Sequence, residues 1–316
     1  MTDLNIQDLQ VNINTGQETY YVLRGVTFKV PAGAKLGLVG ESGCGKSMTA
    51  ASIMRLLPKN ATIVKGQILL DQLNLINLSE KEMRQIRGKR ITLIFQDAAS
   101  ALNPLCSAVQ HVADVYARHI SLSRKESLHH AYELLAKTGI PKHLAHNYPH
   151  ELSGGMSQRV MIAMALGCSP EILIADEPTT GLDVTIQTQV VELIERTVEE
   201  IGSSLIFISH DIGLVSEICD RIVVMYAGKI VEAGNREQII SGPGHPYTTA
   251  LLHSFRAQPG KRMPFIPGRV PDLRIRQEGC SFAPRCSLAD NQCWHSEPKL
   301  SEISPGHEVA CFHMDK

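Results

Sequence analysis

The sequence has no apolar run long enough to span a lipid bilayer. Its best apolar stretch, residues 160–168, ends at Ser169-Pro170, whereas a spanning helix needs roughly 18 residues. The first residues, Met-Thr-Asp-Leu-Asn, lack the basic start and apolar centre of a signal peptide. We therefore expect a cytoplasmic protein that contacts a membrane only through a partner.

The sequence also lacks an excess of charge of either sign. Its 31 Lys and Arg residues nearly balance 32 Asp and Glu residues, which gives a formal charge of −1, so no overall field attracts nucleic acid. Hydrophobic residues make up 43% of the 316 positions and charged residues 20%, which is typical of a globular protein with a sizeable core. At roughly 150 residues per domain, the length predicts two domains, or one large domain with an extension.

Apolar stretches typical of strands alternate with helical patterns along most of the chain. The strand-like stretches are residues 22–30, 36–39, 68–70, 91–95, 172–176, 204–209, 223–226 and 229–232; the helical ones are 46–57, 97–147, 153–167, 185–200 and 211–219. This alternation predicts an α/β fold with a central, mostly parallel sheet. We expect the helical block 97–167 to be an inserted subdomain, and Ala227-Gly228 to form a hairpin turn.

A glycine-rich segment fits the phosphate-loop pattern G-x-x-x-x-G-K-S. It follows the strand-like stretch 36–39 and opens a helical pattern that Pro58 ends. Backbone N–H groups of such a loop surround phosphates, and the helix N-terminus adds positive potential. We expect Lys46 to reach the β- and γ-phosphates of ATP and Ser47 to bind Mg²⁺. The candidate ATP-binding residues are Gly40, Glu41, Ser42, Gly43, Cys44, Gly45, Lys46, Ser47 and Met48.

Two acidic residues lie at the end of the strand-like stretch 172–176: Asp176 is its last residue, and Glu177 follows directly. Asp176 and Glu177 could be acids where a strand meets solvent, or they could serve phosphoryl transfer. In the second interpretation Asp176 holds Mg²⁺ and Glu177 polarises the attacking water, a general-base role worth about 10²–10⁴ in rate. Positioning and charge stabilisation supply most of the remaining acceleration.

Two further polar residues follow strand-like stretches. Gln96 comes after residues 91–95 and could contact Mg²⁺ or the attacking water while acting as a hinge for the helical subdomain. His210 comes after residues 204–209 and could hold both a phosphate oxygen and Glu177. A histidine at the surface is the alternative.

Residues 152–159, Leu-Ser-Gly-Gly-Met-Ser-Gln-Arg, predict a helix whose N-terminus presents bare N–H groups. On a separate helical arm, this end could not reach the phosphate loop of its own chain, but it could donate to the γ-phosphate held by a second subunit. Residues 179–183 would then lie where the two subunits meet. The predicted ATPase is therefore a head-to-tail dimer with two shared sites, to which this segment contributes Ser153, Gly154, Gly155, Gln158 and Asp183.

An aromatic side chain is expected to stack on adenine, which is worth roughly 1–3 kcal/mol per base. Tyr20 and Tyr21, directly before the strand-like stretch 22–30, are the candidates. Packing of both rings against that strand is the equal alternative.

The last 60 residues differ in character from the rest. Residues 256–276 contain four prolines and six basic residues against Asp272 alone, which favours an extended, solvated basic linker. Contact with a membrane surface or another acidic partner is the alternative. Four of the eight cysteines crowd into the last 37 residues: Cys280, Cys286, Cys293 and Cys311. In a reducing cytoplasm such a cluster is more often a metal site than a disulfide framework. The spacing matches neither a ferredoxin run nor a zinc ribbon, so unligated thiols remain an alternative.

Taken together, the motifs resemble those of the ATP-binding subunit of ABC transporters over about residues 5–250. Residues 40–47 resemble Walker A, Gln96 the Q-loop, 152–159 the signature, 172–176 Walker B, 179–183 the D-loop and His210 the switch histidine. The resemblance implies a P-loop ABC ATPase domain at 1–255, with a RecA-like parallel sheet core, an N-terminal antiparallel β region and a helical subdomain at about 97–167. A Pro-rich linker and small Cys-rich extension would occupy 256–316. One departure from the family concerns adenine binding. The aromatic residue that stacks on adenine in this family usually lies near Ile13 or Asn14, and neither of these residues is aromatic.

The tail narrows the resemblance to the oligopeptide/dipeptide/nickel importer subfamily. The residues concerned are 245–248, 251–252, 266–273 and 279–286. In this subfamily the four tail cysteines resemble ligands of a [4Fe–4S] cluster, which would staple a small tail with little core of its own; Zn²⁺ is the alternative. The resemblance also implies a second ATPase subunit, identical or paralogous, two membrane permeases and an extracytoplasmic substrate-binding protein. The chain would then lie peripherally on the cytoplasmic face of the inner membrane.

Two other functions are compatible with the sequence. A soluble ABC ATPase of translation or DNA repair is one, although such proteins usually carry tandem ATPase domains or long coiled coils, and this chain has neither. The other makes the tail a redox module. The transported ligand, whether peptide, nickel chelate or metallophore, is chosen by permeases and a capture protein.

Overall fold

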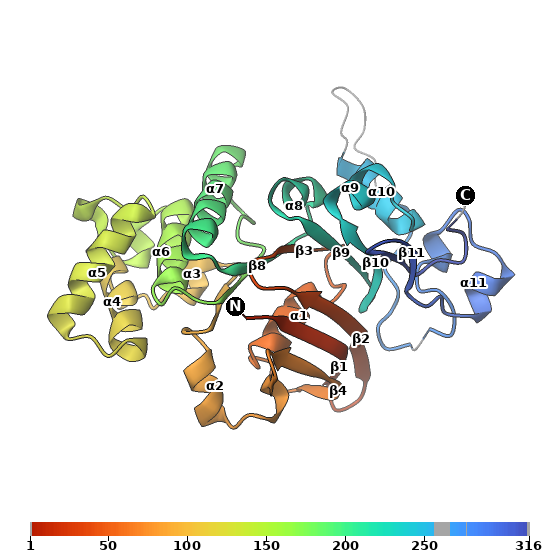
Figure 1. The fold of residues 1–316 in the computed structure, drawn as a ribbon, viewed down its shortest axis with the longest axis horizontal. Coiled ribbons are helices and arrows are strands. Elements are labelled where there is room, and N and C mark those ends of the chain that lie inside the picture. The colour runs from red at the N-terminus through yellow and green to blue at the C-terminus, as the bar shows by residue number, and fades with distance from the viewer. Residues whose placement is uncertain (1, 256–265, 276, 315–316) are drawn as a thin grey trace. The chain divides into compact units, whose positions relative to one another are not determined.

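The computed structural model describes residues 2–255, 266–275 and 277–314, and Figure 1 shows its ribbon. The chain forms two compact units. The signature unit comprises Met1–Thr2, Pro31–Ala34 and Asn77–Ile206, and the phosphate-loop unit comprises Asp3–Val30, Lys35–Ile76 and Phe207–Lys316. Much of the predicted basic linker, residues 256–265 and 276, lies outside the described residues. None of the described helices combines the length and apolar character that crossing a membrane requires.

The phosphate-loop unit contains most of the strands. Its strands are β1 (Leu4–Asn14), β2 (Thr19–Val30), β3 (Lys35–Val39), β4 (Ala61–Leu70), β5 (Leu73–Asn74), β9 (Arg221–Tyr226), β10 (Lys229–Asn235), β11 (Ser301–Ser304) and β12 (His307–Val309). Its helices are α1 (Lys46–Ile53), α8 (Ile212–Ile218), α9 (Arg236–Ser241), α10 (Pro246–Phe255) and α11 (Asn291–His295).

An antiparallel sheet in the order β2-β1-β4-β5 forms the N-terminal part of this unit. Leu4, Ile6, Leu9 and Val11 of β1 are fully buried, and their polar neighbours are not. This alternation is typical of a strand with one face in a core. The predicted N-terminal antiparallel region is therefore confirmed, and β1 is an additional strand that the sequence pattern did not reveal.

A second group of strands carries the phosphate loop and the tail. β3 and β9 are parallel, and β9, β10, β12 and β11 follow as antiparallel neighbours. The pairing of Glu232 with Val309 attaches the tail strand β12 to β10. Residues 301–309 therefore extend the sheet, which the sequence did not predict. The turn at Ala227-Gly228 joins β9 to β10, as predicted.

The signature unit contains most of the helices. Its elements are α2 (Glu80–Ile86), β6 (Ile91–Ile94), α3 (Ala98–Ala101), α4 (Ala108–His119), α5 (Arg124–Lys137), α6 (Gly154–Leu166), β7 (Ile172–Asp176) and α7 (Val184–Ile201). β6 and β7 are parallel neighbours. β8 (Ser204–Ser209) begins in this unit and ends in the other. The predicted α/β class is confirmed by these parallel pairs and their intervening helices.

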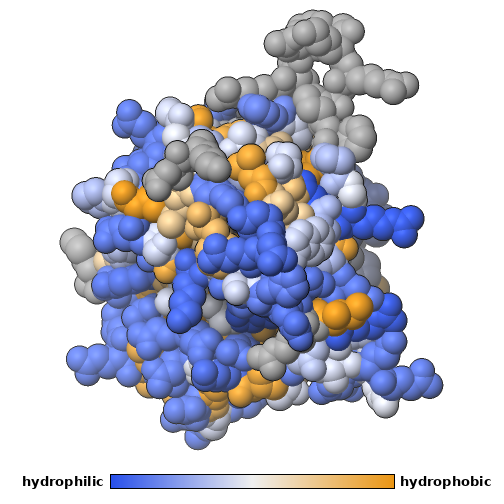
Figure 2. Space-filling view, turned by 90° about the vertical axis from the view of Figure 1, so that its right-hand side faces the viewer, coloured by the Kyte–Doolittle hydropathy of each residue, from blue (hydrophilic) through white to orange (hydrophobic). Residues whose placement is uncertain are grey.

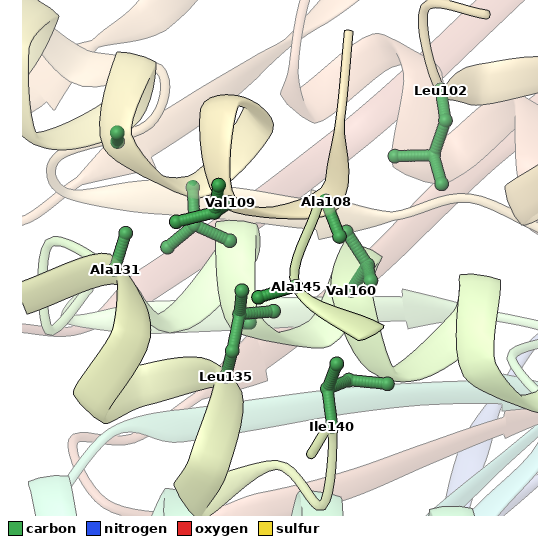
Figure 3. Packing of buried hydrophobic residues seen from close by; sticks show 11 residues of the cluster. Leu102, Ala108, Val109, Ala131, Leu135, Ile140, Ala145 and Val160 are labelled. Carbon is green, nitrogen blue, oxygen red and sulfur yellow. The ribbon is translucent and has the colours of Figure 1, made fainter. Parts of the chain in front are cut away.

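The helices α4, α5 and α6 share a small apolar core with the segments that join them. Figure 3 shows Val109, Ala131 and Leu135 directed toward one another, and Ile140 belongs to the same cluster. Each of these four side chains is at most 1% exposed. The helical insertion predicted at 97–167 thus has its own packed centre, which can hold the segment 152–159 as a rigid piece.

Some predicted boundaries differ from the structure. The helix that follows the phosphate loop ends at Ile53, because Arg55 adopts a left-handed backbone with φ of 50°. β2 begins at Thr19, so Tyr20 and Tyr21 lie inside a strand and not before it.

Figure 2 shows the face on the side of α11 and the C-terminal segment. Most of this face is hydrophilic, and apolar residues appear as small separate spots. A surface of this kind is typical of one that stays in contact with water.

Candidate functional site

The phosphate loop joins β3 to α1 and needs glycine for steric reasons. Gly40 has φ of 154°, and a Cβ there would lie 2.2 Å from the carbonyl oxygen of Met225. Gly45 has φ of 109°, and a Cβ there would lie 2.7 Å from Leu23. An L side chain cannot be accommodated at either position. Because both residues are glycine, the loop can adopt this conformation and its backbone can approach a bound group closely.

Lys46 supports this loop from within. Its side chain is buried, and its ammonium group donates to the carbonyl oxygens of Gly40 at 2.7 Å and Glu41 at 3.2 Å. A phosphate bound in this loop would compete with these carbonyls for the ammonium group. Ser47, the predicted Mg²⁺ ligand, is exposed at the first turn of α1.

His210 lies in the same unit and directly follows β8. Its side chain is exposed. The next residue, Asp211, caps α8 by accepting a hydrogen bond from the backbone N–H of Leu214 at 3.1 Å. The cap fixes the backbone immediately after His210.

In the signature unit, the structure brings Gln96 and Glu177 together. The amide nitrogen of Gln96 lies 3.3 Å from a carboxylate oxygen of Glu177. The same oxygen accepts a hydrogen bond from the Thr180 hydroxyl at 2.9 Å. Asp176 is the last residue of β7, one position before Glu177.

The backbone of Glu177 is itself unusual. Its φ is 46°, in the left-handed region that residues with a side chain seldom adopt. Such a conformation costs about 1–3 kcal/mol and persists where surrounding contacts enforce it. Here the Thr180 N–H donates to the Glu177 carbonyl at 3.2 Å and closes a turn.

The predicted signature segment begins α6 as expected. The Ser153 hydroxyl caps the helix by accepting from the Met156 N–H at 3.3 Å. Gly154 and Gly155 form the first turn, and a Cβ at Gly155 would lie 2.6 Å from Ile186 of α7. Gln158 is 3% exposed, and its amide nitrogen has no hydrogen-bond partner among the described residues.

Asp183 caps the next helix. Its carboxylate accepts from the Ile186 N–H at 3.1 Å at the start of α7. The Thr179 hydroxyl, four positions earlier, accepts from the Gln187 amide at 3.1 Å. The predicted D-loop is therefore tied to the first turns of α7 by two side chains.

The strand register distinguishes the two tyrosine candidates. Tyr20 is paired directly with Ile13, and Tyr21 with Asn12. Directly paired residues in an antiparallel sheet share a face, so Tyr20 projects from the face of Ile13, near which the family's aromatic residue lies. The Tyr20 hydroxyl donates to Glu18 at 3.0 Å.

The four tail cysteines converge. All of them line one small cavity in the phosphate-loop unit, together with His245, Phe282 and His313. Burial, with the nearby thiols of Cys293 and Cys311 acting in the same direction, raises the pKa of Cys280 to about 11. Burial likewise raises the pKa values of Cys293 and Cys311. A bound cation is the usual means of stabilising such thiolates.

Two potential metal-binding residues escaped the sequence analysis. Donor atoms of Asp290, Cys293 and His313 lie within 4.8 Å of one another. The sequence offered one signal for them: Asp290 lies three residues before the predicted ligand Cys293, and His313 lies two residues after the predicted ligand Cys311. The structure also gives these groups ordinary roles, because Asp290 caps α11 through the Cys293 N–H and lies 3.2 Å from His313.

Comparison with known proteins decides the family. Residues 23–180 match the ABC transporter family, and residues 231–293 match the C-terminal region of oligopeptide/dipeptide transporters. The chain belongs to the ATP-binding subunits of ABC transporters. This ABC subunit is 48% identical to a probable peptide ABC transporter ATP-binding protein of Sinorhizobium fredii, over 99% of this chain and 95% of the relative.

Further comparisons support the assignment along the whole length. The oligopeptide transport ATP-binding protein OppD of Bacillus subtilis is 43% identical, over 97% of this chain and 87% of the relative. A dimeric ATP-binding cassette, solved in a post-hydrolysis state with ADP and Pi, matches with a TM-score of 0.66 and 27% identity, over 74% of this chain and 98% of that one. The ABC subunit is therefore an ATPase of the type that works as a dimer with membrane permeases.

Proposed function

We propose that this ABC subunit hydrolyses ATP to power the import of peptides. The observation that carries the proposal is the match over 99% of the chain to a probable peptide transporter subunit, with a tail that matches the oligopeptide/dipeptide C-terminal region. The tail distinguishes this assignment from ABC ATPases in general, because it lies beyond the ATPase motifs.

The nucleotide site is shared between two subunits in this proposal. The phosphate loop of one subunit holds the phosphates and Mg²⁺ through its N–H groups, Lys46 and Ser47. The first turn of α6 in the neighbouring subunit donates to the γ-phosphate through Ser153 and Gly155. The Ser153 cap and the packing of Gly155 against Ile186 support this role, since both hold that turn in place.

Hydrolysis depends on residues that follow the strands. Asp176 holds Mg²⁺, Glu177 orients and polarises the attacking water, and His210 holds the γ-phosphate. The contact between Gln96 and Glu177 supports the placing of both near the water. Tyr20 is the favoured partner for adenine, since it shares a face with Ile13.

The variant Glu177→Gln tests the catalytic assignment. It removes the charge that polarises the water while keeping the size of the side chain, so hydrolysis should fall by about 10²-fold or more with ATP binding retained. Glu192→Gln, an exposed position on α7, is the matched control and should turn over ATP at the wild-type rate. Unchanged turnover in Glu177→Gln would contradict the role.

The transported ligand is tested on the assembled transporter. Subunits that co-purify with this chain from detergent-solubilised membranes can be reconstituted in vesicles and supplied with the substrate-binding protein. We expect ATP-dependent uptake of labelled di- or oligopeptide. Uptake of nickel chelate or metallophore alone would overturn the peptide assignment. This experiment also identifies the second ATPase subunit.

We further propose that Cys280, Cys286, Cys293 and Cys311 hold a [4Fe–4S] cluster. Their convergence on one cavity supports this ligand set, and four thiolates suit either iron–sulfur or zinc. When bound, the cluster supplies a crosslink between four points of a short tail. Metal analysis and visible absorption of anaerobically purified protein test the choice: iron with brown absorption, both lost in Cys286→Ser, is expected, and zinc alone would overturn it.

A further inference from the structure

A buried arginine of the tail pairs with the phosphate loop. Arg285 directs its two terminal nitrogens at the two carboxylate oxygens of Glu41, at 2.6 and 3.0 Å. The Arg285 side chain is 2% exposed and that of Glu41 is 27% exposed. Both residues lie in the phosphate-loop unit, although 244 positions separate them in the sequence. Paired contacts of this kind are stronger and more specific than single ones.

The guanidinium group is fully used. Besides the two contacts with Glu41, it donates to the carbonyl oxygens of Ile266 at 3.0 Å and Pro267 at 2.8 Å, and to the Tyr226 hydroxyl at 3.2 Å. These are five contacts for the five N–H groups that an arginine has. A lysine has three donors on one nitrogen and cannot reproduce the arrangement.

The same loop residue has a second tie, to helix α10, against which the tail residue Phe282 packs. The backbone N–H of Glu41 donates to the Tyr247 hydroxyl at 2.8 Å. The Tyr247 ring lies 4.6 Å from that of Tyr226 and 5.4 Å from that of Phe282. Phe282 and Arg285 belong to one short segment, so the backbone and the carboxylate of Glu41 are both fixed by the tail and its packing.

The charge of Glu41 matters because of what the loop binds. An acid beside the phosphates of ATP repels them, and the repulsion is strong where water is partly excluded. Arg285 neutralises this charge and holds the carboxylate in one orientation. The energetic effect on the phosphates therefore depends on a residue far outside the ATPase motifs.

We propose that Arg285 is a positioning residue for the phosphate loop, through which the tail sets the affinity for ATP. The inference rests on the proposed function only in requiring that this loop binds ATP. The segment that carries Arg285 is bounded by Cys280 and Cys286, and Ala283 N–H donates to the Cys280 carbonyl at 3.0 Å. The arrangement of the residues around the cysteine cavity therefore also affects the contact between Arg285 and Glu41.

Binding of Mg²⁺–ATP to the purified full chain, measured by calorimetry, tests the proposal. Arg285→Ala should weaken ATP binding about tenfold, because it leaves Glu41 unneutralised beside the phosphates. Adding Glu41→Gln to this variant should restore affinity to within about threefold of wild type, since the repelling charge is then gone. A merely structural arginine would show no such rescue.

Controls separate charge from folding. Arg269→Ala removes an exposed tail arginine and should bind ATP within about twofold of wild type, as expected for a solvated charge. If Arg285→Ala does not fold, Arg285→Lys carries the test, and the loss of the paired contact should weaken binding by about threefold or more.

The outcomes are distinct. Wild-type affinity in folded Arg285→Ala, or in Arg285→Lys where the alanine variant does not fold, would overturn the positioning role. Failure of Glu41→Gln to rescue would overturn the charge argument on which that role depends. Absence of ATP binding by the wild-type chain would instead contradict the proposed function.

Discussion

The side chains of Gln96 and Glu177, 81 positions apart, meet at 3.3 Å between amide nitrogen and carboxylate oxygen. The contact joins the segment that leads into the helical insertion with the acid that follows β7. A movement of the insertion that shifts Gln96 would therefore also alter the hydrogen bonding of Glu177. This is a direct physical route by which an event at the helices could reach the hydrolytic residue.

The first prediction concerns this contact. A hydrogen bond to a charged group contributes about 1.5–3 kcal/mol, so Gln96→Ala should lower kcat by about 10- to 100-fold with ATP affinity retained. In a Glu177→Gln background the same change should add less than about threefold, because the charged partner is already gone. Steady-state kinetics of the four proteins measure the coupling. Gln72→Ala, at an exposed position, is the control, and additive losses would contradict the coupling.

The second prediction separates the two tyrosines. Tyr20→Ala should weaken ATP binding by a factor corresponding to about 1–3 kcal/mol of stacking, whereas Tyr20→Phe should keep most of the affinity, because it keeps the ring. Tyr21→Ala is the matched change on the neighbouring residue and should have little effect. Comparison of ATP with triphosphate alone shows whether the base is what is recognised. Equal losses in Tyr20→Ala and Tyr21→Ala would contradict the assignment.

The third prediction concerns the glycines at the start of α6. Alanine usually favours a helix over glycine, but a Cβ at Gly155 would lie 2.6 Å from Ile186. Gly155→Ala should therefore destabilise the protein by about 1–3 kcal/mol through overpacking. At Gly154 the nearest contact of a Cβ would be 3.6 Å, from Leu182, so Gly154→Ala should be neutral or slightly stabilising. Urea unfolding compares the two, and equal effects would contradict the packing argument.

The fourth prediction is a pH dependence that arises from His245. Burial lowers the pKa of His245 to about 3, and the neutral ring accepts a hydrogen bond from the Tyr247 N–H at 3.0 Å. The pKa of His245 in the folded protein lies below its unfolded value near 6.5. The contribution of this residue to the free energy of unfolding is therefore fully present above pH 6.5 and is lost as the pH falls toward 3. The expected loss from this group between pH 7 and pH 5 is about 2 kcal/mol.

Denaturant unfolding of wild type and His245→Asn at the two pH values measures the effect. The asparagine cannot gain a proton in this range but offers an oxygen acceptor. The wild type should lose about 2 kcal/mol more than the variant on going to pH 5. Equal losses would show that the histidine does not control the pH dependence.

The sequence predicted the nucleotide motifs better than the strands that support them. Phosphate loops, helix caps and strand ends depend on local spacing, so residues 40–47, Ser153 and Asp176 stand where the pattern placed them. The strand β1 was not predicted because Asp8 has φ of 46° and the pairing with β2 shifts between Ile6 and Leu9. The shift breaks the alternation of apolar residues that marks a strand.

Contacts between distant segments could not be predicted from the sequence. The pairing of β10 with β12 joins residues 232 and 309, and all four residues of the next strand, β11, are exposed. Neither β11 nor β12 has an apolar pattern from which a strand could be predicted. Arg285 likewise appeared only as part of a cysteine-containing stretch, since nothing local links it to Glu41.

The proposed function depends most on ATP being enclosed between two ATPase subunits. Light scattering of Glu177→Gln, purified with any ATPase subunit that accompanies the chain, tests this directly. We expect a 34.7 kDa species without nucleotide and a dimer of ATPase subunits when Mg²⁺–ATP is added. A variant that stays monomeric with ATP bound, alongside a wild type that hydrolyses ATP at full rate as a monomer, would contradict the account.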